Sequence, residues 1–115
     1  RVVLSLPAAL APIKVAVLPL VKKDGLPEIA RKIMDELKIY FNCQYEEKDS
    51  IGKRYRRQDA IGTPFCVTID HETLKDNAVT LRHRDTMQQE RINIESLKNI
   101  IEKEVDMNYL IKKLL

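Results

Sequence analysis

The first half of the chain contains two kinds of apolar pattern. Residues 13–20 are nearly continuous Val, Ala and Leu, which is typical of a strand buried on both faces of a parallel sheet. Apolar side chains then recur every three to four residues at Leu26, Ala30, Ile33, Leu37 and Phe41. This spacing predicts an amphipathic helix. Residues 41–46 alternate between apolar and polar, which indicates a half-buried outer strand and completes a βαβ unit.

The second half predicts another helix and another strand, and these are followed by a hairpin and a last helix. Asp49 or Ser50 can cap a second helix, and the helix is expected to be anchored to the core by Ile51, Tyr55 and Ile61. The remaining segments are predicted to be an apolar strand parallel to the first, a polar connection, a hairpin and a third amphipathic helix, at residues 65–69, 70–77, 78–94 and 94–105. The fold class is therefore α/β, a mixed five-stranded sheet with three helices in the order β-α-β-α-β-β-β-α.

Size and composition fit one domain. The chain has 115 residues, 44% of them hydrophobic, which is enough for one packed core and too few for two. Residues 1–12 contain Pro7 and Pro12 and are interpreted as a leading segment or linker, and residues 13–115 as the domain. The chain begins with Arg1 and not Met, so a preceding domain is expected outside it.

Cysteine usage and hydropathy exclude several protein classes. Cys43 and Cys66 are far apart and lie in apolar runs, which favours free, buried thiols in a reduced, cytoplasmic compartment. A zinc site needs paired Cys or His at close spacing, and that pattern is missing from the sequence. No run approaches the ~20 apolar residues of a membrane span.

Residue patterns of known active sites are also missing. The three glycines, Gly25, Gly52 and Gly62, fit neither a Walker loop nor a dinucleotide-binding loop. His71 and His83 have no evident nucleophile partner, and Asp70 and Glu72 lie at a turn where carboxylates are usually solvated or capping. We therefore expect no catalytic residue, metal site or cofactor within these residues.

Basic residues carry the one candidate for function. Between residues 48 and 59, five cations stand against two acids: Lys48, Lys53, Arg54, Arg56 and Arg57 against Asp49 and Asp59. On the hairpin, a period of two places Thr80, Arg82 and Arg84 on one face. An Arg–Asp pair at its end is chemically suited to unpaired bases, since Arg donates or stacks and Asp accepts from an amino group. A solvated surface explains the same charges, and spacing alone leaves both interpretations open.

Three motifs resemble the C-terminal anticodon-binding domain of glycyl-tRNA synthetases. They are Ser-Ile-Gly-Lys-Arg-Tyr-Arg-Arg-Gln-Asp-Ala-Ile-Gly-Thr-Pro-Phe from Ser50, Val-Thr-Ile-Asp from Val67 and Leu-Arg-His-Arg-Asp-Thr-Met-Gln-Gln from Leu81. Residues 11–20 are similar to the first strand of that domain. The resemblance covers roughly residues 8–105. It implies a homodimeric class II ligase whose separate catalytic domain uses ATP and Mg²⁺ to attach glycine to tRNA in translation. It also implies a partner, tRNA(Gly), whose anticodons share cytosine at the second and third positions, and neither a membrane nor DNA as partner.

The resemblance also implies which residues meet the tRNA. By position, Arg84 matches an anticodon-contacting arginine of the related threonine enzyme, and Arg82 and Asp85 are assigned with it. Backbone or loop contacts are assigned to Lys48, Ser50, Lys53, Arg54 and Arg57. Ala60 and His83 stand where the family pattern has acids. Their loss is expected to make the surface more positive and to loosen the orientation of the two arginines.

Two other functions compete with anticodon binding. The domain could serve as a structural or protein-interaction module with little tRNA affinity of its own, using the apolar tail Leu110–Leu115. A free-standing small α/β enzyme is disfavoured, because no catalytic constellation is evident.

Overall fold

A computed structural model describes the backbone of residues 11–114 and the side chains of residues 11–106. Its elements are β1 (Val15–Pro19), α1 (Leu26–Leu37), β2 (Cys43–Tyr45), α2 (Ile51–Ala60), β3 (Phe65–Ile69), α3 (Thr73–Asp76), β4 (Ala78–His83), β5 (Gln89–Asn93) and α4 (Ile94–Leu114). The α/β class and the five strands are confirmed. Most of the predicted leading segment, residues 1–12, lies outside the described residues.

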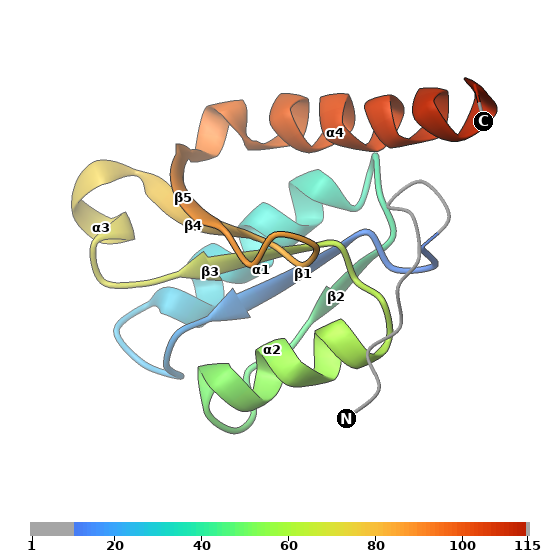
Figure 1. Cartoon of the computed structure of the whole chain (residues 1–115). Coiled ribbons are helices and arrows are strands. Elements are labelled where there is room, and N and C mark those ends of the chain that lie inside the picture. The colour runs from blue at the N-terminus through green and yellow to red at the C-terminus, as the bar shows by residue number, and fades with distance from the viewer. Residues whose placement is uncertain (1–10, 115) are drawn as a thin grey trace.

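The five strands form one mixed sheet in the order β2-β1-β3-β4-β5 (Figure 1). Strand β1 pairs in parallel with both β2 and β3, while β4 is antiparallel to β3 and β5 is antiparallel to β4. The short strand β2 lies at the edge, as its alternating pattern predicts. Hairpin β4–β5 lies at the other end of this strand order, with β5 as the second edge strand.

Helices cover both faces of the sheet. The chain moves from β1 outward to β2 and then back across β1 to β3, so two right-handed crossovers place α1 and α2 on opposite faces. Figure 1 shows α2 on one side of the sheet and α4 on the other. Helix α4 packs on the face that α1 covers, because Leu97 and Ile101 share one buried cluster with Leu26 and Ile33 of α1.

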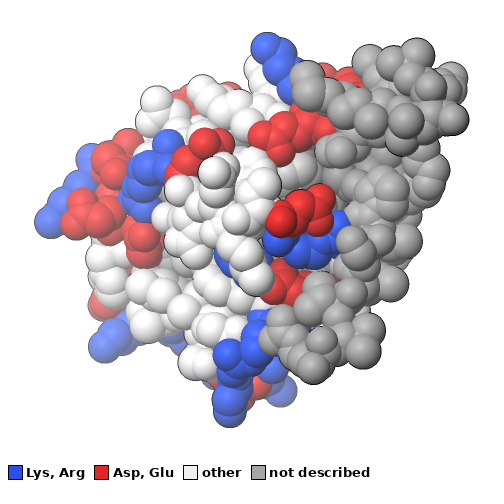
Figure 2. Space-filling view, in the orientation of Figure 1, with Lys and Arg blue, Asp and Glu red and all other residues white. Residues whose placement is uncertain are grey.

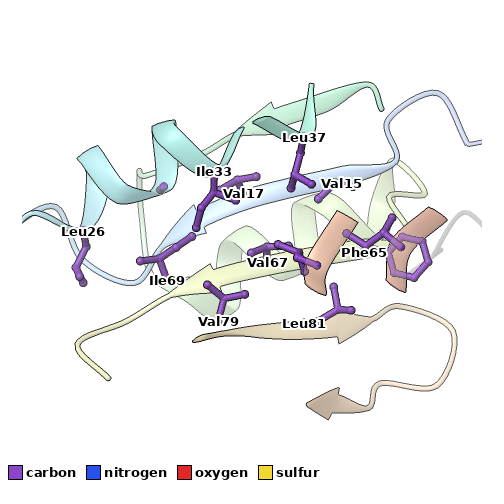
Figure 3. Packing of buried hydrophobic residues seen from close by; sticks show 13 residues of the cluster. Val15, Val17, Leu26, Ile33, Leu37, Phe65, Val67, Ile69, Val79 and Leu81 are labelled. Carbon is purple, nitrogen blue, oxygen red and sulfur yellow. The ribbon is translucent and has the colours of Figure 1, made fainter. Parts of the chain in front are cut away.

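The main core lies between the sheet and helices α1 and α4. Alternate strand residues point toward the helices, among them Val15 and Val17 of β1 and Val67 of β3 (Figure 3). Leu37 of α1 and Leu81 of β4 are buried in the same cluster. Each fully buried aliphatic side chain contributes about 1.5–3 kcal/mol, so this face supplies most of the stability of the domain.

The face under α2 has a smaller apolar core and more polar contacts. Ala16, Leu18 and Cys66 are buried there against Ile51 and Tyr55 of α2. The Tyr55 hydroxyl and Thr68 Oγ1 share a 2.6 Å hydrogen bond.

One predicted anchor of α2 is wrong. Ile61 is 41% exposed, because α2 ends at Ala60 and the backbone leaves the helical path at Ile61, which has φ −93° and ψ 1°. Arg54, Gln58 and Asp59 fill the inward positions of α2 instead.

A fourth helix, α3, occupies the segment predicted to be only a polar connection. Its single turn is too short for a 3.6-residue period to be visible. It starts where the Asp70 carboxylate accepts hydrogen bonds from the backbone N–H and the hydroxyl of Thr73, both at 3.2 Å. Helix α4 continues past residue 105 to Leu114. The apolar tail Leu110–Leu115 lies outside the described side chains.

Candidate nucleic-acid interface

Arg82, one of the predicted base-contacting residues, is buried in the structure. Its Nη1 and Nη2 donate to the two carboxylate oxygens of Asp59 at 2.8 and 3.0 Å. The guanidinium also lies over the Tyr55 ring, 4.8 Å from its centre. The hydrogen bonds to Asp59 raise the pKa of Arg82. Arg82 therefore joins β4 to α2 and has little surface to offer a ligand.

Arg84, the second predicted arginine, is buried as well. Its Nη1 donates to the Gly62 carbonyl at 2.5 Å, and its backbone N–H donates to the Pro64 carbonyl at 3.0 Å. Its Nε and Nη2 both donate to Asp85 Oδ1, at 3.0 and 2.9 Å. The Arg84 side chain is 4% exposed and that of Asp85 is 59% exposed. Of the three predicted anticodon residues, only Asp85 therefore presents its side chain to solvent.

The turn that carries Asp85 is held by its own backbone. His83 N–H donates to the Gln88 carbonyl at 2.9 Å, and Met87 N–H donates to the His83 carbonyl at 2.8 Å. Met87 has a φ of +60°, in the left-handed region that closes tight turns. Residues 85–90 are all exposed. We call residues 84–89 the hairpin tip.

Arg82 and Arg84 are held by groups other than Ala60 and His83, the two departures from the family pattern. His83 points toward β5 and α4, where Nε2 lies 3.6 Å from Glu90 Oε1 and Nδ1 lies 3.1 Å from Glu104 Oε2. Its ring also meets Phe65 edge-on. Ala60 is exposed on the last turn of α2. Arg82 and Arg84 take their orientation from other groups, namely Asp59, the Gly62 carbonyl and Asp85.

Arg54 is the largest of the fully buried side chains in the described part of the molecule. Its guanidinium donates to three backbone carbonyls, those of Pro19 at 2.6 Å, Leu20 at 3.0 Å and Glu46 at 3.0 Å. These carbonyls lie at or just after the carboxyl ends of β1 and β2. Arg54 therefore ties α2 to this end of the sheet. Burial lowers the pKa of Arg54.

Two more predicted contact residues have structural partners beside Arg54. Arg57 donates through Nε to Glu46 at 2.8 Å and through Nη1 to Asp49 at 2.9 Å, and these bonds raise the pKa of Arg57. The Ser50 hydroxyl accepts from the Lys53 N–H at 3.3 Å and so caps α2, as its sequence position predicts. The charge of Arg57 is therefore neutralised by two acids, and the hydroxyl of Ser50 already accepts a hydrogen bond from α2.

Besides Arg57, the exposed cations on this side are Lys48, Lys53 and Arg56. Within the described part of the chain, none of the three has an ion-pair partner. Arg56 stands out because it was not assigned from the sequence, although it lies three residues after Lys53 on the outward face of α2. The exposure of Arg56 could have been predicted from its position on the helix. Arg54 and Gln58 share the inward face, whereas Lys53 and Arg56 do not. Figure 2 shows Lys and Arg in separate groups, most of them beside acidic side chains.

The predicted site residues fall at two ends of the sheet. His83 is paired with Phe65 at the start of β3, so the hairpin tip lies at the amino ends of the parallel strands. Arg54 marks the carboxyl ends. Helix α2 connects the two ends and is about 15 Å long for its ten residues. The structure therefore brings Arg82, Arg84 and Asp85 together and places Lys48, Ser50 and Lys53 one helix length away.

Other reactive groups form no second site among the described residues. Burial raises the pKa of the Cys66 thiol to about 12 and that of the Cys43 thiol to about 11. His71 lies on the surface, 2.9 Å from Asp24. Within residues 11–106 no three His, Cys, Asp or Glu side chains are grouped closely enough to hold a metal ion. Of the described helices, none has the length and apolar character needed to cross a membrane.

Comparison with known proteins finds similarity to anticodon-binding domains and to glycine–tRNA ligases. Residues 14–104 match the family described as "Anticodon binding domain". The chain is 54% identical over 109 residues to a glycine–tRNA ligase of Borrelia hermsii, covering 95% of this chain and 24% of that protein. It is 55% identical over 101 residues to a glycine–tRNA ligase of Corynebacterium glutamicum, covering 88% and 22%. The chain thus spans about a quarter of the length of these relatives.

Solved structures show the same fold. The RNA-binding domain of threonyl-tRNA synthetase from Cryptosporidium parvum superposes with a TM-score of 0.78 at 25% identity, covering 87% of this chain and 25% of that one. Prolyl-tRNA synthetase from the same organism has a TM-score of 0.80 at 19% identity, covering 96% and 25%. The resemblance that the motifs of residues 50–89 indicate is confirmed, and the chain belongs to the anticodon-binding domain family.

Proposed function

We propose that this chain is the anticodon-binding domain of a glycine–tRNA ligase and that it binds the anticodon of tRNA(Gly). The observation that carries the proposal is the 54% identity to a glycine–tRNA ligase over 95% of the chain. The geometry supports it at the hairpin tip. There, exposed polar side chains project from a turn that Arg82 joins to α2 and Arg84 joins to the loop after α2.

Affinity for tRNA in this proposal comes from the exposed cations near α2. Lys48, Lys53 and Arg56 are exposed and free of ion pairs within the described residues. Each phosphate that such a cation neutralises releases counterions, so binding weakens as salt rises. Each contact adds roughly 0.7–0.9 to the slope of the logarithm of the binding constant against the logarithm of the salt concentration. Arg54 and Arg57 serve in the framework instead, because the first is buried and the second is paired with Glu46 and Asp49.

The activity of the whole protein extends beyond this chain. In the proposed parent ligase, a separate catalytic domain uses ATP and Mg²⁺ to attach glycine to tRNA, two subunits associate, and the protein works in the cytoplasm. The domain described here supplies recognition of the tRNA and no catalytic group. Neither a membrane nor DNA is a partner in this proposal.

A second candidate function is that of a protein-interaction module. Ile39 and Tyr40, after the end of α1, are 74% and 55% exposed. They line a depression of about 590 Å³ between this loop and α4. Exposed apolar side chains beside a depression are typical of a protein contact. This candidate places the partner on the face of the sheet opposite α2.

One titration separates the two candidates. Fluorescently labelled tRNA(Gly) and an unrelated tRNA are titrated with this chain in a series of salt concentrations. Anticodon binding predicts tighter binding of tRNA(Gly) and a steep salt dependence. Replacing Lys53 and Arg56 by Gln should weaken binding of both tRNAs and lower the salt slope by about 2. The matched control replaces Lys32 and Lys75, two exposed lysines of α1 and α3, and should change neither. A folded chain that binds no tRNA would favour the interaction module.

A further inference from the structure

We propose that Asp85 contacts an anticodon base directly and that Arg84 is a positioning residue that aims the Asp85 carboxylate. This inference rests on the proposed function and refines it. Arg84, which matches a base-contacting arginine of the related enzyme, is buried. The side chain exposed to a ligand is that of its neighbour, Asp85. The ligand group assigned to Asp85 is the exocyclic amine of an unpaired cytosine.

The first support is the exposure of the two side chains. Arg84 is 4% exposed, whereas Asp85 is 59% exposed. Arg84 reaches inward to the Gly62 carbonyl through Nη1. A base that replaced this contact would leave the Gly62 carbonyl buried without a donor, which is unfavourable.

The second support is the geometry of the Arg84–Asp85 contact. Nε and Nη2 of Arg84 both end on Oδ1 of Asp85, at 3.0 and 2.9 Å. Within the described residues, Oδ2 of Asp85 takes part in no hydrogen bond. Two donors from one planar guanidinium therefore tether Oδ1 at a single place beside Arg84. The carboxylate is thus held near the hairpin tip with Oδ2 left to accept, and a tethered acceptor loses less entropy on binding than a mobile one.

The third support is the chemistry of a lone carboxylate oxygen. An ionised carboxylate only accepts hydrogen bonds. Cytosine presents an amino group at C4, and Asp is suited to accept from it. Uracil has a carbonyl oxygen at the same position, which meets the carboxylate with like partial charge. Asp85 is therefore expected to favour cytosine over uracil by about 5- to 150-fold at the base that it contacts.

The experiment measures the cytosine-to-uracil preference of this chain. Anticodon stem-loops of tRNA(Gly), with each anticodon cytosine replaced in turn by uracil, are titrated against wild type, Asp85→Asn, Arg84→Lys and the double variant. Asp35→Asn, an exposed acid on α1, is the matched control. Urea unfolding of each variant shows whether it is folded.

The proposal predicts one position at which the preference depends on Asp85. Asp85→Asn should lower the preference there to about threefold or less, because the new amide can donate to the uracil oxygen. Arg84→Lys should lower it partly, and adding it to Asp85→Asn should cause no further loss, since both act through one carboxylate. Asp35→Asn should leave the preference unchanged.

Two outcomes would overturn this inference and leave the proposed function standing. The first is an Asp85→Asn chain that keeps the full preference at every position. The second is a further loss of preference when Arg84→Lys is added to it, which would mean that Arg84 reads a base itself. Failure of the wild-type chain to bind any stem-loop would instead contradict the proposed function.

Discussion

Arg82 of β4 and Asp59 of α2 form a buried, two-pronged ion pair, with N–O distances of 2.8 and 3.0 Å. The pair joins the hairpin to the end of the helix that carries the exposed cations. Removing one partner of a buried pair leaves an uncompensated charge.

Asp59→Ala should therefore lower the free energy of unfolding by about 3–5 kcal/mol. The double variant Asp59→Leu, Arg82→Met should recover much of that loss, because neither charge remains buried. Urea unfolding measures both. A loss no larger than that of Arg57→Gln, which breaks only exposed ion pairs, would contradict the buried geometry.

Arg54 is expected to be a structural residue and not an RNA contact. Arg54→Lys keeps the charge but loses the planar arrangement of donors that reaches the carbonyls of Pro19, Leu20 and Glu46. The free energy of unfolding should fall by about 1–3 kcal/mol for the carbonyls left without a donor. Arg56→Lys, two residues away and exposed, is the control and should be neutral. Equal stability of the two variants would refute the assignment.

Arg91 of β5 makes stability depend on acid pH. It donates to Asp70 and Asp76, with N–O distances from 2.9 to 3.1 Å. Partial burial raises the pKa of Asp70, but hydrogen bonds from Arg91 and Thr73 reverse this and hold it below 3.8. Hydrogen bonding to Arg91 is also the main cause that lowers the pKa of Asp76.

Lowered carboxylate pKa values stabilise the folded state above the unfolded pKa of 3.8, and this stabilisation is lost as pH falls through the folded values. The difference in unfolding free energy between wild type and Arg91→Gln should be constant from pH 5 to 8 and should shrink below pH 3.8. Urea unfolding at each pH tests this. A difference that grows on acidification would have the wrong sign.

Neither cysteine should react rapidly in the folded chain. With a thiol pKa of about 12 for Cys66, roughly one molecule in ten thousand carries a thiolate at pH 8. Iodoacetamide labelling followed by mass spectrometry should modify Cys43 slowly and Cys66 only after urea is added. Rapid labelling of Cys66 without denaturant would show that the core under α2 opens readily.

The fold was predictable from the sequence wherever a helix or strand was long enough for its apolar spacing to repeat. The βαβ unit, the edge position of β2 and the Ser50 cap all follow from apolar spacing and capping chemistry. Helix α3 was missed, because one turn shows no period. The exposure of Ile61 was not predictable, because apolar spacing does not show that α2 ends one residue earlier, at Ala60.

The candidate site was less predictable, because charge does not tell on which side of an element a residue lies. Arg54, Arg82 and Arg84 look like surface residues in the sequence and are buried in the structure. Their partners are either backbone carbonyls, which no residue type encodes, or Asp59, which is distant from Arg82 along the chain. Arg56 could have been identified from the phase of α2.

The most direct test of the central claim is an NMR titration of the isotopically labelled chain with the tRNA(Gly) anticodon stem-loop. If the hairpin tip meets the anticodon, the largest changes in amide chemical shift should fall at residues 85–89, with smaller changes at Lys53 and Arg56. Changes confined to Ile39, Tyr40 and the neighbouring residues of α4, with the tip unaffected, would contradict it.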